Sequence, residues 1–435
     1  MDISRSVDNS LNRTIEFLKE LIKIDSQQGE PISQCPFGIG PKKSLDKTLD
    51  YCASLGFSVK NIDNYIGYAE IGEGEELIGI PMHLDIVPPG EGWSVDPFSG
   101  AVIDNIIYGR GVIDNKGAVS MLIHVLKNIE DMYPTINKRI RLIFGTNEET
   151  GMKCIKYYLD KGEEIPSMGF TPDAMYPVVN GEKGRVHIRI EKEIKIDKSK
   201  PYILVRGGTK ENVVPSHCTA KIINGIISEL TTKGVAVHAS NPEKGENAIS
   251  KMVIKIVEDN MDFQHREDIE LVSKYLCSDY YGDALGINQY DEVFKNTTLN
   301  LGILKVNEEK IVCELDIRYG KNIVLNNIID RFKKVFCNGW KIEVIAHKDL
   351  HYVDESNLVL KKLLEAYEEV TDENGYTIAM GGGTYASWFK DMVAFGPKFL
   401  AYKTGGHGVD ERVPINHIRK NMEIYTLALI KLLEL

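Results

Sequence analysis

The chain has 435 residues, of which 43% are hydrophobic, enough for two or three domains with substantial cores. Its net charge of −11 and its lack of a basic cluster argue against nucleic acid or an anionic membrane as a partner. It has no signal-peptide pattern, no apolar run near the roughly 18 residues of a membrane span and no C-x-x-C pair among its seven cysteines, so we expect a reduced, cytoplasmic protein.

Apolar periodicity predicts alternating helices and strands in the first third of the chain. Residues 11–24, 45–55 and 117–129 have the pattern of helices, whereas 77–80 and 139–144 have that of buried strands. The alternation indicates an α/β fold with a mostly parallel sheet flanked by helices. Polar residues that follow such strands meet at one edge of the sheet.

The pattern changes near residue 184, where short strands around a Gly-Gly-Thr turn replace the helices. Helical periodicity returns after Ser356 and continues in a last helix, 418–435. We therefore predict that residues 184–348 form an α+β domain inserted into a first domain made of 1–183 and 349–435. The strands expected in the insert are 186–190, 203–205, 220–223 and 314–319.

His83 and Asp85 follow the strand at 77–80. Residues two apart in an extended chain point to the same side. His83 could therefore bind a metal through one ring nitrogen while Asp85 accepts the proton of the other and fixes the ring. A polar turn without a function is the alternative.

Asp114 ends the stretch Gly109-Arg110-Gly111-Val112-Ile113-Asp114, just before a predicted helix. It could cap that helix, as aspartates often do. It could instead bridge two cations, because one carboxylate can hold two metals roughly 3.5–4 Å apart. Sequence alone leaves both interpretations open.

Glu148 and Glu149 follow the strand at 139–144. Adjacent like charges usually lie in a solvated loop. They could also divide the work of a metal site, with Glu149 as a ligand and Glu148 as a base. A metal lowers the pKa of water to about 7, so a carboxylate base can operate at neutral pH.

Asp173 and His407 complete the set of metal-type side chains. Asp173 follows Pro172, which fixes its approach, and His407 stands among glycines that leave room to reach a crowded centre. A turn residue and a surface histidine are the alternatives. Two divalent ions with a carboxylate beside them are suited to splitting amide bonds with water.

Together these motifs resemble the co-catalytic metallopeptidases that include aminoacylase, succinyl-diaminopimelate desuccinylase and the carboxypeptidase-G type. Within that family they are most similar to the PepV-like dipeptidases. The likeness spans nearly the whole chain, and several motifs, each modest alone, make it specific because they occur in the family's order. Its main pieces are Met82-His83-Leu84-Asp85, Gly109-Arg110-Gly111 with Asp114, Glu148-Glu149-Thr150-Gly151, and His407 with Glu411.

The resemblance implies a ligand set for two divalent ions. His83 and Asp173 would hold one ion, Glu149 and His407 the other, and Asp114 would bridge both. Zinc is the favoured metal, and manganese or cobalt also suits such ligands.

The resemblance also implies that Glu148 is the general base and that Asp85 orients His83. The inserted domain would act as a lid, in which His238 stabilises the oxyanion. Arg318 would grip the substrate carboxylate, unless it only pairs with Asp316 or Glu314. The implied substrate-binding residues are Asn212, Arg318, Gly382, Gly383 and Thr384.

The chain departs from the family at three places. Asn115 stands where an aspartate is common, although the Asp114–Asn115 peptide is still expected to be cis. Ser387 replaces an arginine common in the PepV-like branch, and the stretch 396–402 lacks the usual Phe-Pro-Gly. These changes leave the expected metal chemistry intact and concern the substrate pocket.

We therefore predict a two-domain metallodipeptidase that acts on small dipeptides with free termini. One alternative is an N-acyl amino acid deacylase or desuccinylase with the same metals, and another is a catalytically silent metal-binding scaffold. The size of the insert favours a monomer, with a dimer as the alternative.

Overall fold

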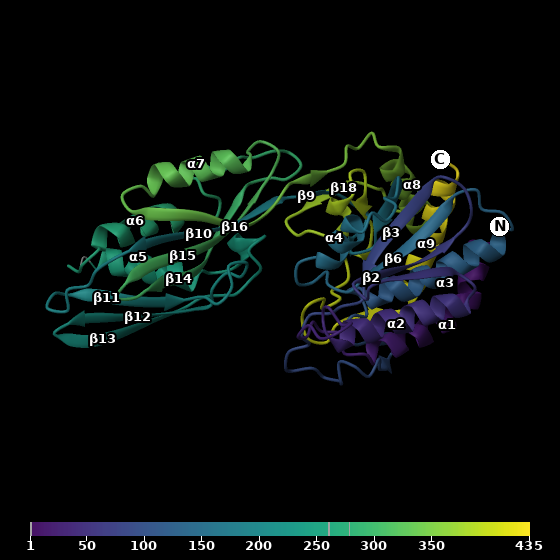
Figure 1. Cartoon of the computed structure of the whole chain (residues 1–435), viewed down its shortest axis with the longest axis horizontal. Helices are drawn as coiled ribbons and strands as arrows, with labels where there is room; N and C mark the ends of the chain where they lie inside the picture. The colour runs from purple at the N-terminus through teal and green to yellow at the C-terminus, as the bar shows by residue number, and fades with distance from the viewer. Residues whose placement is uncertain (1, 260–261, 278) are drawn as a thin grey trace. The chain divides into compact units, whose positions relative to one another are not determined.

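The computed structural model describes residues 2–259, 262–277 and 279–435. They form two compact units, each with its own sheet and apolar core (Figure 1). Unit 2 comprises Gly181–His351 and Ala379–Gly382, and unit 1 comprises the remaining residues. The sequence alone places the boundaries at 184 and 348 and does not indicate that 379–382 belong to unit 2.

A nine-stranded sheet forms the centre of unit 1, and its last strands lead the chain into and out of unit 2. Its strands are β1 (Ser58–Ile62), β2 (Ile66–Ile71), β3 (Leu77–His83), β6 (Arg139–Gly145), β7 (Met168–Thr171), β9 (Val178–Glu182), β17 (His351–Tyr352), β18 (Thr377–Met380) and β19 (Val393–Ala394). They run in the order β1-β2-β6-β3-β7-β19-β9-β17, with β18 paired to β9.

The predicted α/β class is confirmed, and the sheet is mixed. Strands β6, β3, β7 and β19 are parallel to their neighbours in that run. The pairs β1–β2, β2–β6 and β19–β9 are antiparallel. The parallel strands therefore form the centre of the sheet, which is the part that carries the site described below.

Most ends of the observed helices of unit 1 lie beyond the ends predicted from sequence. Asp2, for example, caps the first helix by accepting a hydrogen bond from the Arg5 backbone N–H, so this helix begins well before residue 11. No helix of the described residues is long and apolar enough to cross a membrane. The helices are α1 (Ile3–Ile22), α2 (Ile39–Ser54), α3 (Lys116–Met132), α4 (Lys153–Asp160), α8 (Leu358–Thr371) and α9 (Ile415–Leu433), with a 3-10 turn, η2 (Tyr385–Trp388).

Two small sheets lie beside the main sheet of unit 1. One contains β4 (Val102–Ile103), β5 (Ile106–Tyr108) and β21 (Arg412–Pro414). The other pairs β8 (Ala174–Met175) with β20 (Pro397–Lys398) in parallel. In each small sheet, a strand from the last part of the chain pairs with a strand more than 200 residues earlier in sequence. These pairings bring the later segments near the site.

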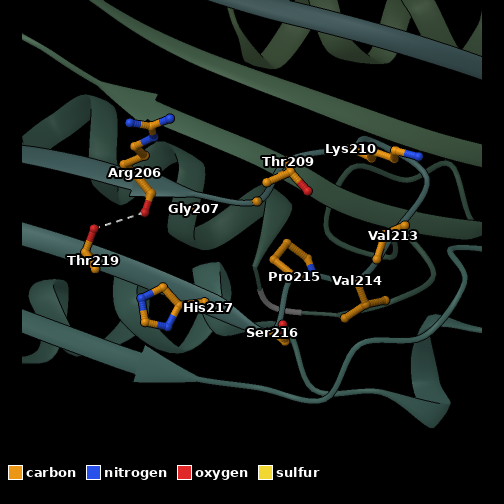
Figure 2. Close-up of a pocket in the computed structure, with 11 residues that line it drawn as sticks. Arg206, Gly207, Thr209, Lys210, Val213, Val214, Pro215, Ser216, His217 and Thr219 are labelled. Atoms are coloured by element: carbon orange, nitrogen blue, oxygen red, sulfur yellow. Dashed lines mark hydrogen bonds between the residues drawn. The ribbon is translucent and has the colours of Figure 1, made fainter. Parts of the chain in front are cut away.

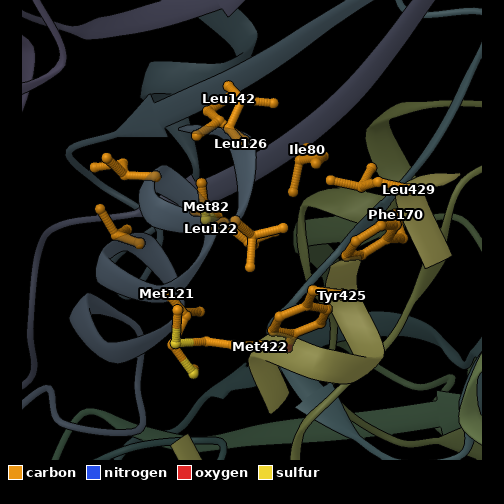
Figure 3. Close-up of a cluster of buried hydrophobic side chains, with 14 of the residues drawn as sticks. Ile80, Met82, Met121, Leu122, Leu126, Leu142, Phe170, Met422, Tyr425 and Leu429 are labelled. Atoms are coloured by element: carbon orange, nitrogen blue, oxygen red, sulfur yellow. The ribbon is translucent and has the colours of Figure 1, made fainter. Parts of the chain in front are cut away.

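Alternation along β3 separates the core from the site. Ile80 and Met82 enter an apolar cluster with Leu122 of α3 and Leu429 of α9 (Figure 3). Because successive strand residues point to opposite faces, His83 points away from that cluster. The buried strand thus holds a histidine firmly at its carboxyl end.

His124 of α3 is buried between helices of unit 1 and offers a test of this packing. Its Nδ1 lies 2.9 Å from the Ser120 carbonyl oxygen and its Nε2 lies 2.8 Å from the Tyr51 hydroxyl. Burial lowers the pKa of His124 to about 4, from 6.5. The ring is therefore neutral in the folded protein at neutral pH.

We expect the folded protein to lose stability through His124 as the pH falls below 6.5. Between pH 6.5 and 4 the unfolded chain binds a proton at this residue that the folded chain does not, so unfolding is favoured. From pH 7.5 to 5 the loss is roughly 2 kcal/mol, from about 1.5 pH units at ~1.36 kcal/mol each. Urea unfolding of the wild type and of His124→Gln at both pH values measures it. The exposed-residue variant His217→Gln should retain the wild-type loss, and an equal loss in His124→Gln would contradict the assignment.

Unit 2 is an antiparallel sheet with helices against one face (Figure 1). The strand order is β13-β12-β11-β14-β15-β10-β16, which agrees with the predicted α+β class. Its elements are β10 (Gly184–Glu193), β11 (Tyr202–Gly207), β12 (His217–Asn224), β13 (Ile226–Lys233), η1 (Pro242–Lys244), α5 (Ala248–Glu258), α6 (Arg266–Leu276), β14 (Thr298–Val306), β15 (Lys310–Tyr319), α7 (Leu325–Val335) and β16 (Trp340–Lys348).

The two faces of β15 differ in character. Leu315 and Ile317 pack into the apolar cluster with the helices. The alternate residues Asp316 and Arg318 point to the other face. Arg318 therefore belongs to the polar face of unit 2.

Candidate metal centre

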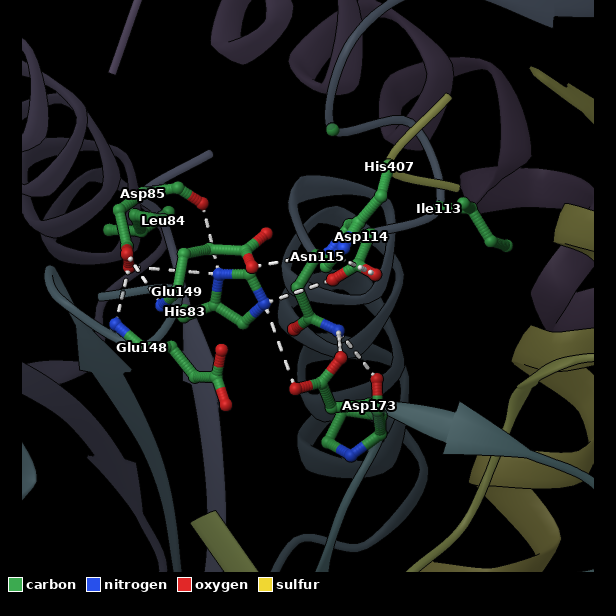
Figure 4. Close-up of polar contacts among 12 residues, drawn as sticks. His83, Leu84, Asp85, Ile113, Asp114, Asn115, Glu148, Glu149, Asp173 and His407 are labelled. Carbon is green, nitrogen blue, oxygen red and sulfur yellow. Dashed lines mark hydrogen bonds and ion pairs between the residues drawn. The ribbon is translucent and has the colours of Figure 1, made fainter. Parts of the chain in front are cut away.

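The parallel strands of unit 1 bring polar residues to one edge of the sheet. His83 is the last residue of β3, Glu148 and Glu149 follow β6, and Asp173 follows β7. Since β6 and β7 flank β3 in parallel, their carboxyl ends meet at the same edge. Asp114 and His407 reach this edge from loops (Figure 4).

His83 lies at the centre of this group and is fully buried. Its Nε2 is 3.1 Å from Asp114 Oδ1 and 3.7 Å from Asp173 Oδ2. Its Nδ1 is 2.9 Å from the backbone oxygen of Asp85 and 3.6 Å from the Asp85 carboxylate. The backbone carbonyl, rather than the expected carboxylate, is the nearer acceptor for the His83 ring.

The Asp85 carboxylate instead fixes the loop after β6. Its two oxygens accept hydrogen bonds from the backbone N–H groups of Glu148 and Glu149, each at 3.0 Å. Asp85 is thus a positioning residue for both the histidine and the paired glutamates. Such outer contacts orient metal ligands.

Asp114 contacts both halves of the group. Its Oδ1 faces His83, and its Oδ2 lies 3.5 Å from His407 Nε2. The helix cap is Asn115, so Asp114 does not fill the capping position considered from sequence. The Asp114–Asn115 peptide is cis, as expected.

Glu149 and His407 form the second half of the group. His407 Nε2 lies 3.1 Å from Glu149 Oε2. The His407 side chain is 56% exposed, yet it faces the carboxylates rather than standing apart on the surface. The two histidines therefore approach the same Asp114 carboxylate from opposite oxygens.

Neighbouring charges push the pKa values of these carboxyls apart. Burial and the Asp173 carboxylate raise the pKa of Glu148 well above its usual range. Although burial opposes it, Lys398 and His83 hold the pKa of Asp114 well below its usual range. The two carboxyls therefore differ in their affinity for a proton, because their surroundings differ.

The donor set fits divalent cations. Ligand atoms of His83, Asp114 and Glu149 converge within 4.8 Å, as do those of His83, Glu148 and Asp173. Among the described residues, the buried Glu149 Oε1 has no hydrogen-bond partner. A buried carboxylate oxygen without a donor is costly unless a cation satisfies it.

Two features of the site were not predicted from sequence. The Lys398 ammonium lies 2.8 Å from Asp114 Oδ2. The buried Glu411 accepts hydrogen bonds from the Arg110 guanidinium at 2.6 Å and from the Asp114 backbone N–H at 3.2 Å. The sequence signal that could have indicated the Lys398 contact is the presence of a lysine within the apolar stretch 393–399.

All three departures from the family have clear contacts, and that of the stretch 396–402 is the Lys398–Asp114 ion pair given above. The Asn115 side-chain amide donates to the Pro172 carbonyl at 2.7 Å, a hydrogen bond that an ionised aspartate could not make. The Ser387 hydroxyl donates to the carbonyl of Thr384, the residue that caps η2, at 2.9 Å. Asn115 thereby secures the loop that carries Asp173.

The residues predicted in the insert cluster within unit 2. Arg318 pairs with the buried Asp316 at 2.8 Å, which is the alternative considered from sequence. Its guanidinium also lies 3.5 Å from His238 Nε2 and donates to the Gly381 carbonyl, next to Gly382. The Asn212 carbonyl accepts a hydrogen bond from the N–H of Ala239, so Asn212 and His238 lie on neighbouring backbone segments. Gly383 and Thr384 belong to unit 1.

The Arg-Gly-Gly-Thr motif, residues 206–209, lines a pocket of about 360 Å³ in unit 2 (Figure 2). Val213, Val214 and Pro215 line the same pocket. The Thr219 hydroxyl donates to the Arg206 carbonyl at 3.4 Å across its rim. The motif therefore forms one wall of a pocket next to the segment that carries Asn212 in sequence.

Comparison with known proteins gives a consistent result. Residues 79–431 match the sequence profile of Peptidase family M20/M25/M40. The Bacillus subtilis (strain 168) protein described as "Putative dipeptidase YtjP" is 30% identical over 99% of this chain and 99% of its own length. Human carnosine dipeptidase 1 shares the fold with a TM-score of 0.64 at 13% identity, covering 100% of this chain and 98% of its own. Bacillus subtilis YXEP protein, described as a dinuclear metal binding peptidase from the M20 family, has a TM-score of 0.59 at 10% identity, with 98% and 99% covered.

Proposed function

Because the chain belongs to Peptidase family M20/M25/M40, we propose that it is a metal-dependent dipeptidase that hydrolyses the amide bond of dipeptides with free termini. The observation that carries the proposal is the convergence of two histidines and four carboxylates at one sheet edge. The full-length similarity to a protein described as a dipeptidase supports the choice of substrate class.

The proposed ligands fall into two halves around Asp114. His83 and Asp173 would hold one cation and Glu149 and His407 the other, with Asp114 shared. Bound divalent cations supply the positive charge that polarises a carbonyl and makes water acidic enough to attack near neutral pH. The mixed histidine and carboxylate set suits zinc, manganese or cobalt, and we propose zinc.

The remaining residues would handle the proton and the substrate. The Glu148 carboxylate would accept a proton from the attacking water and pass it to the leaving amine. Asp85 keeps the Glu148 backbone in place through a hydrogen bond at 3.0 Å.

We assign substrate contacts to five residues, and a stabilising hydrogen bond on the developing oxyanion to His238. Arg318 already pairs with Asp316, so it would bind a substrate carboxylate with its remaining donors. The five residues are Asn212, Arg318, Gly382, Gly383 and Thr384.

Seven free cysteines are compatible with a reducing compartment, and we propose a cytoplasmic protein. We propose a monomer because the inserted unit is large. Size-exclusion chromatography with light scattering distinguishes a monomer from a dimer.

A substrate panel tests the proposal against its two rivals. With zinc or manganese added, free-amine dipeptides should be hydrolysed with kcat/KM at least ~100-fold above that of N-acetylated amino acids. A site that hydrogen-bonds the free amine of a dipeptide discriminates against a substrate that lacks this group. The reverse preference would indicate a deacylase or desuccinylase. Binding of metal without turnover of either class would indicate a silent scaffold.

A further inference from the structure

A lysine ammonium stands inside the candidate metal centre. Lys398 Nζ lies 2.8 Å from Asp114 Oδ2, the same oxygen that faces His407 Nε2 at 3.5 Å. The other oxygen, Oδ1, faces His83. The Asp114 carboxylate is therefore already paired with one positive charge, the Lys398 ammonium, at the oxygen that faces His407.

The backbone holds Lys398 firmly in this position. It belongs to β20, which pairs in parallel with β8 directly after Asp173. The Tyr176 N–H donates to the Lys398 carbonyl at 2.9 Å, and the Ala174 N–H donates to the Gly396 carbonyl at 2.7 Å. The side chain is 27% exposed. It starts from a fixed strand beside the Asp173 loop rather than from a loose surface segment.

The two halves of the centre are also unequal without the lysine. His83 is fully buried, and the Asp85 carbonyl fixes its ring at 2.9 Å. His407 is 56% exposed and has a φ of 61°, a left-handed conformation that favours glycine. The His83 half is thus preorganised for a cation, whereas the His407 half is more open to solvent.

We propose that Lys398 competes with the second cation for Asp114 Oδ2, so that the centre binds one divalent ion tightly and a second one weakly. The tight ion uses His83, Asp173 and Asp114 Oδ1. Binding of the weak ion by Glu149 and His407 requires displacement of the ammonium, because two cations on one carboxylate oxygen repel each other and a buried ion pair must be broken. This inference rests on the proposed metal centre.

Titration of the metal-free full-length chain with Mn²⁺ or Zn²⁺ in a calorimeter tests the proposal without an activity assay. Wild type should give one tight and one weak site, with dissociation constants separated by about tenfold or more. Lys398→Met should tighten the weak site by about tenfold or more and leave the tight site unchanged. Lys398→Arg should keep the separation, and Lys403→Met, which removes an exposed charge five residues further along the chain, should behave as wild type.

Each outcome bears on a distinct claim. Two sites of equal affinity in wild type, or identical titrations of wild type and Lys398→Met, would overturn the competition. Failure of wild type to bind any ion would overturn the proposed metal centre itself. If Lys398→Met does not fold, Lys398→Gln and the wild-type titration alone still decide the question.

Discussion

Glu148→Gln is expected to lower kcat for dipeptide hydrolysis by about 10²–10⁴-fold, the usual contribution of a general base. The amide has the shape of the carboxylate and cannot accept the proton. The Glu148 backbone stays in place because its N–H bonds to Asp85, and Glu148 is not among the proposed ligands. Cation binding measured by calorimetry should therefore stay close to that of wild type.

The control for this variant is Glu73→Gln. Glu73 is exposed and precedes β3, at the end of the sheet opposite to the site. Its kcat should match that of wild type. Near wild-type turnover in Glu148→Gln would show that another group moves the proton, and loss of cation binding would assign Glu148 to the ligands.

Glu411→Ala is expected to destabilise the protein by about 3–5 kcal/mol, because it leaves a buried guanidinium without its partner. Arg110 is 1% exposed and Glu411 is fully buried. The same carboxylate accepts backbone hydrogen bonds from Gly111 and Ile113, at 3.2 and 3.0 Å. The loss would be a large part of the roughly 5–15 kcal/mol that stabilises a typical protein.

Urea unfolding of the metal-free protein measures this effect separately from cation binding. Asp8→Asn, which breaks the exposed Arg419–Asp8 pair, is the control and should leave the midpoint close to that of wild type. A small change in Glu411→Ala would mean that water or another group satisfies Arg110 in the variant.

The metal-type residues could be predicted from sequence because several of them come at the carboxyl end of a strand that periodicity identifies. His83 ends one parallel strand of the sheet and Glu149 and Asp173 follow two others, and the carboxyl ends of such strands converge. Periodicity identified the strands, and the polar residues after them marked the edge. The family resemblance supplied the roles that geometry alone leaves open.

Lys398 could not be placed in the same way. Its contact with Asp114 joins residues 284 positions apart and depends on the pairing of two-residue strands, β8 and β20. Such short strands have no periodicity to detect. The strand pairing in unit 2 could not be predicted for a related reason. Strand β10 lies between β15 and β16, which come more than 100 residues later in sequence.

The division of unit 1 into separate stretches has a consequence for synthesis on the ribosome. Strand β19, residues 393–394, pairs with β7 only after all of 181–351 has been made. Until then β7 is an open sheet edge, which invites pairing with other chains. The nascent N-terminal part must therefore wait for its last strand, and chaperone binding to that edge would protect it while the insert folds.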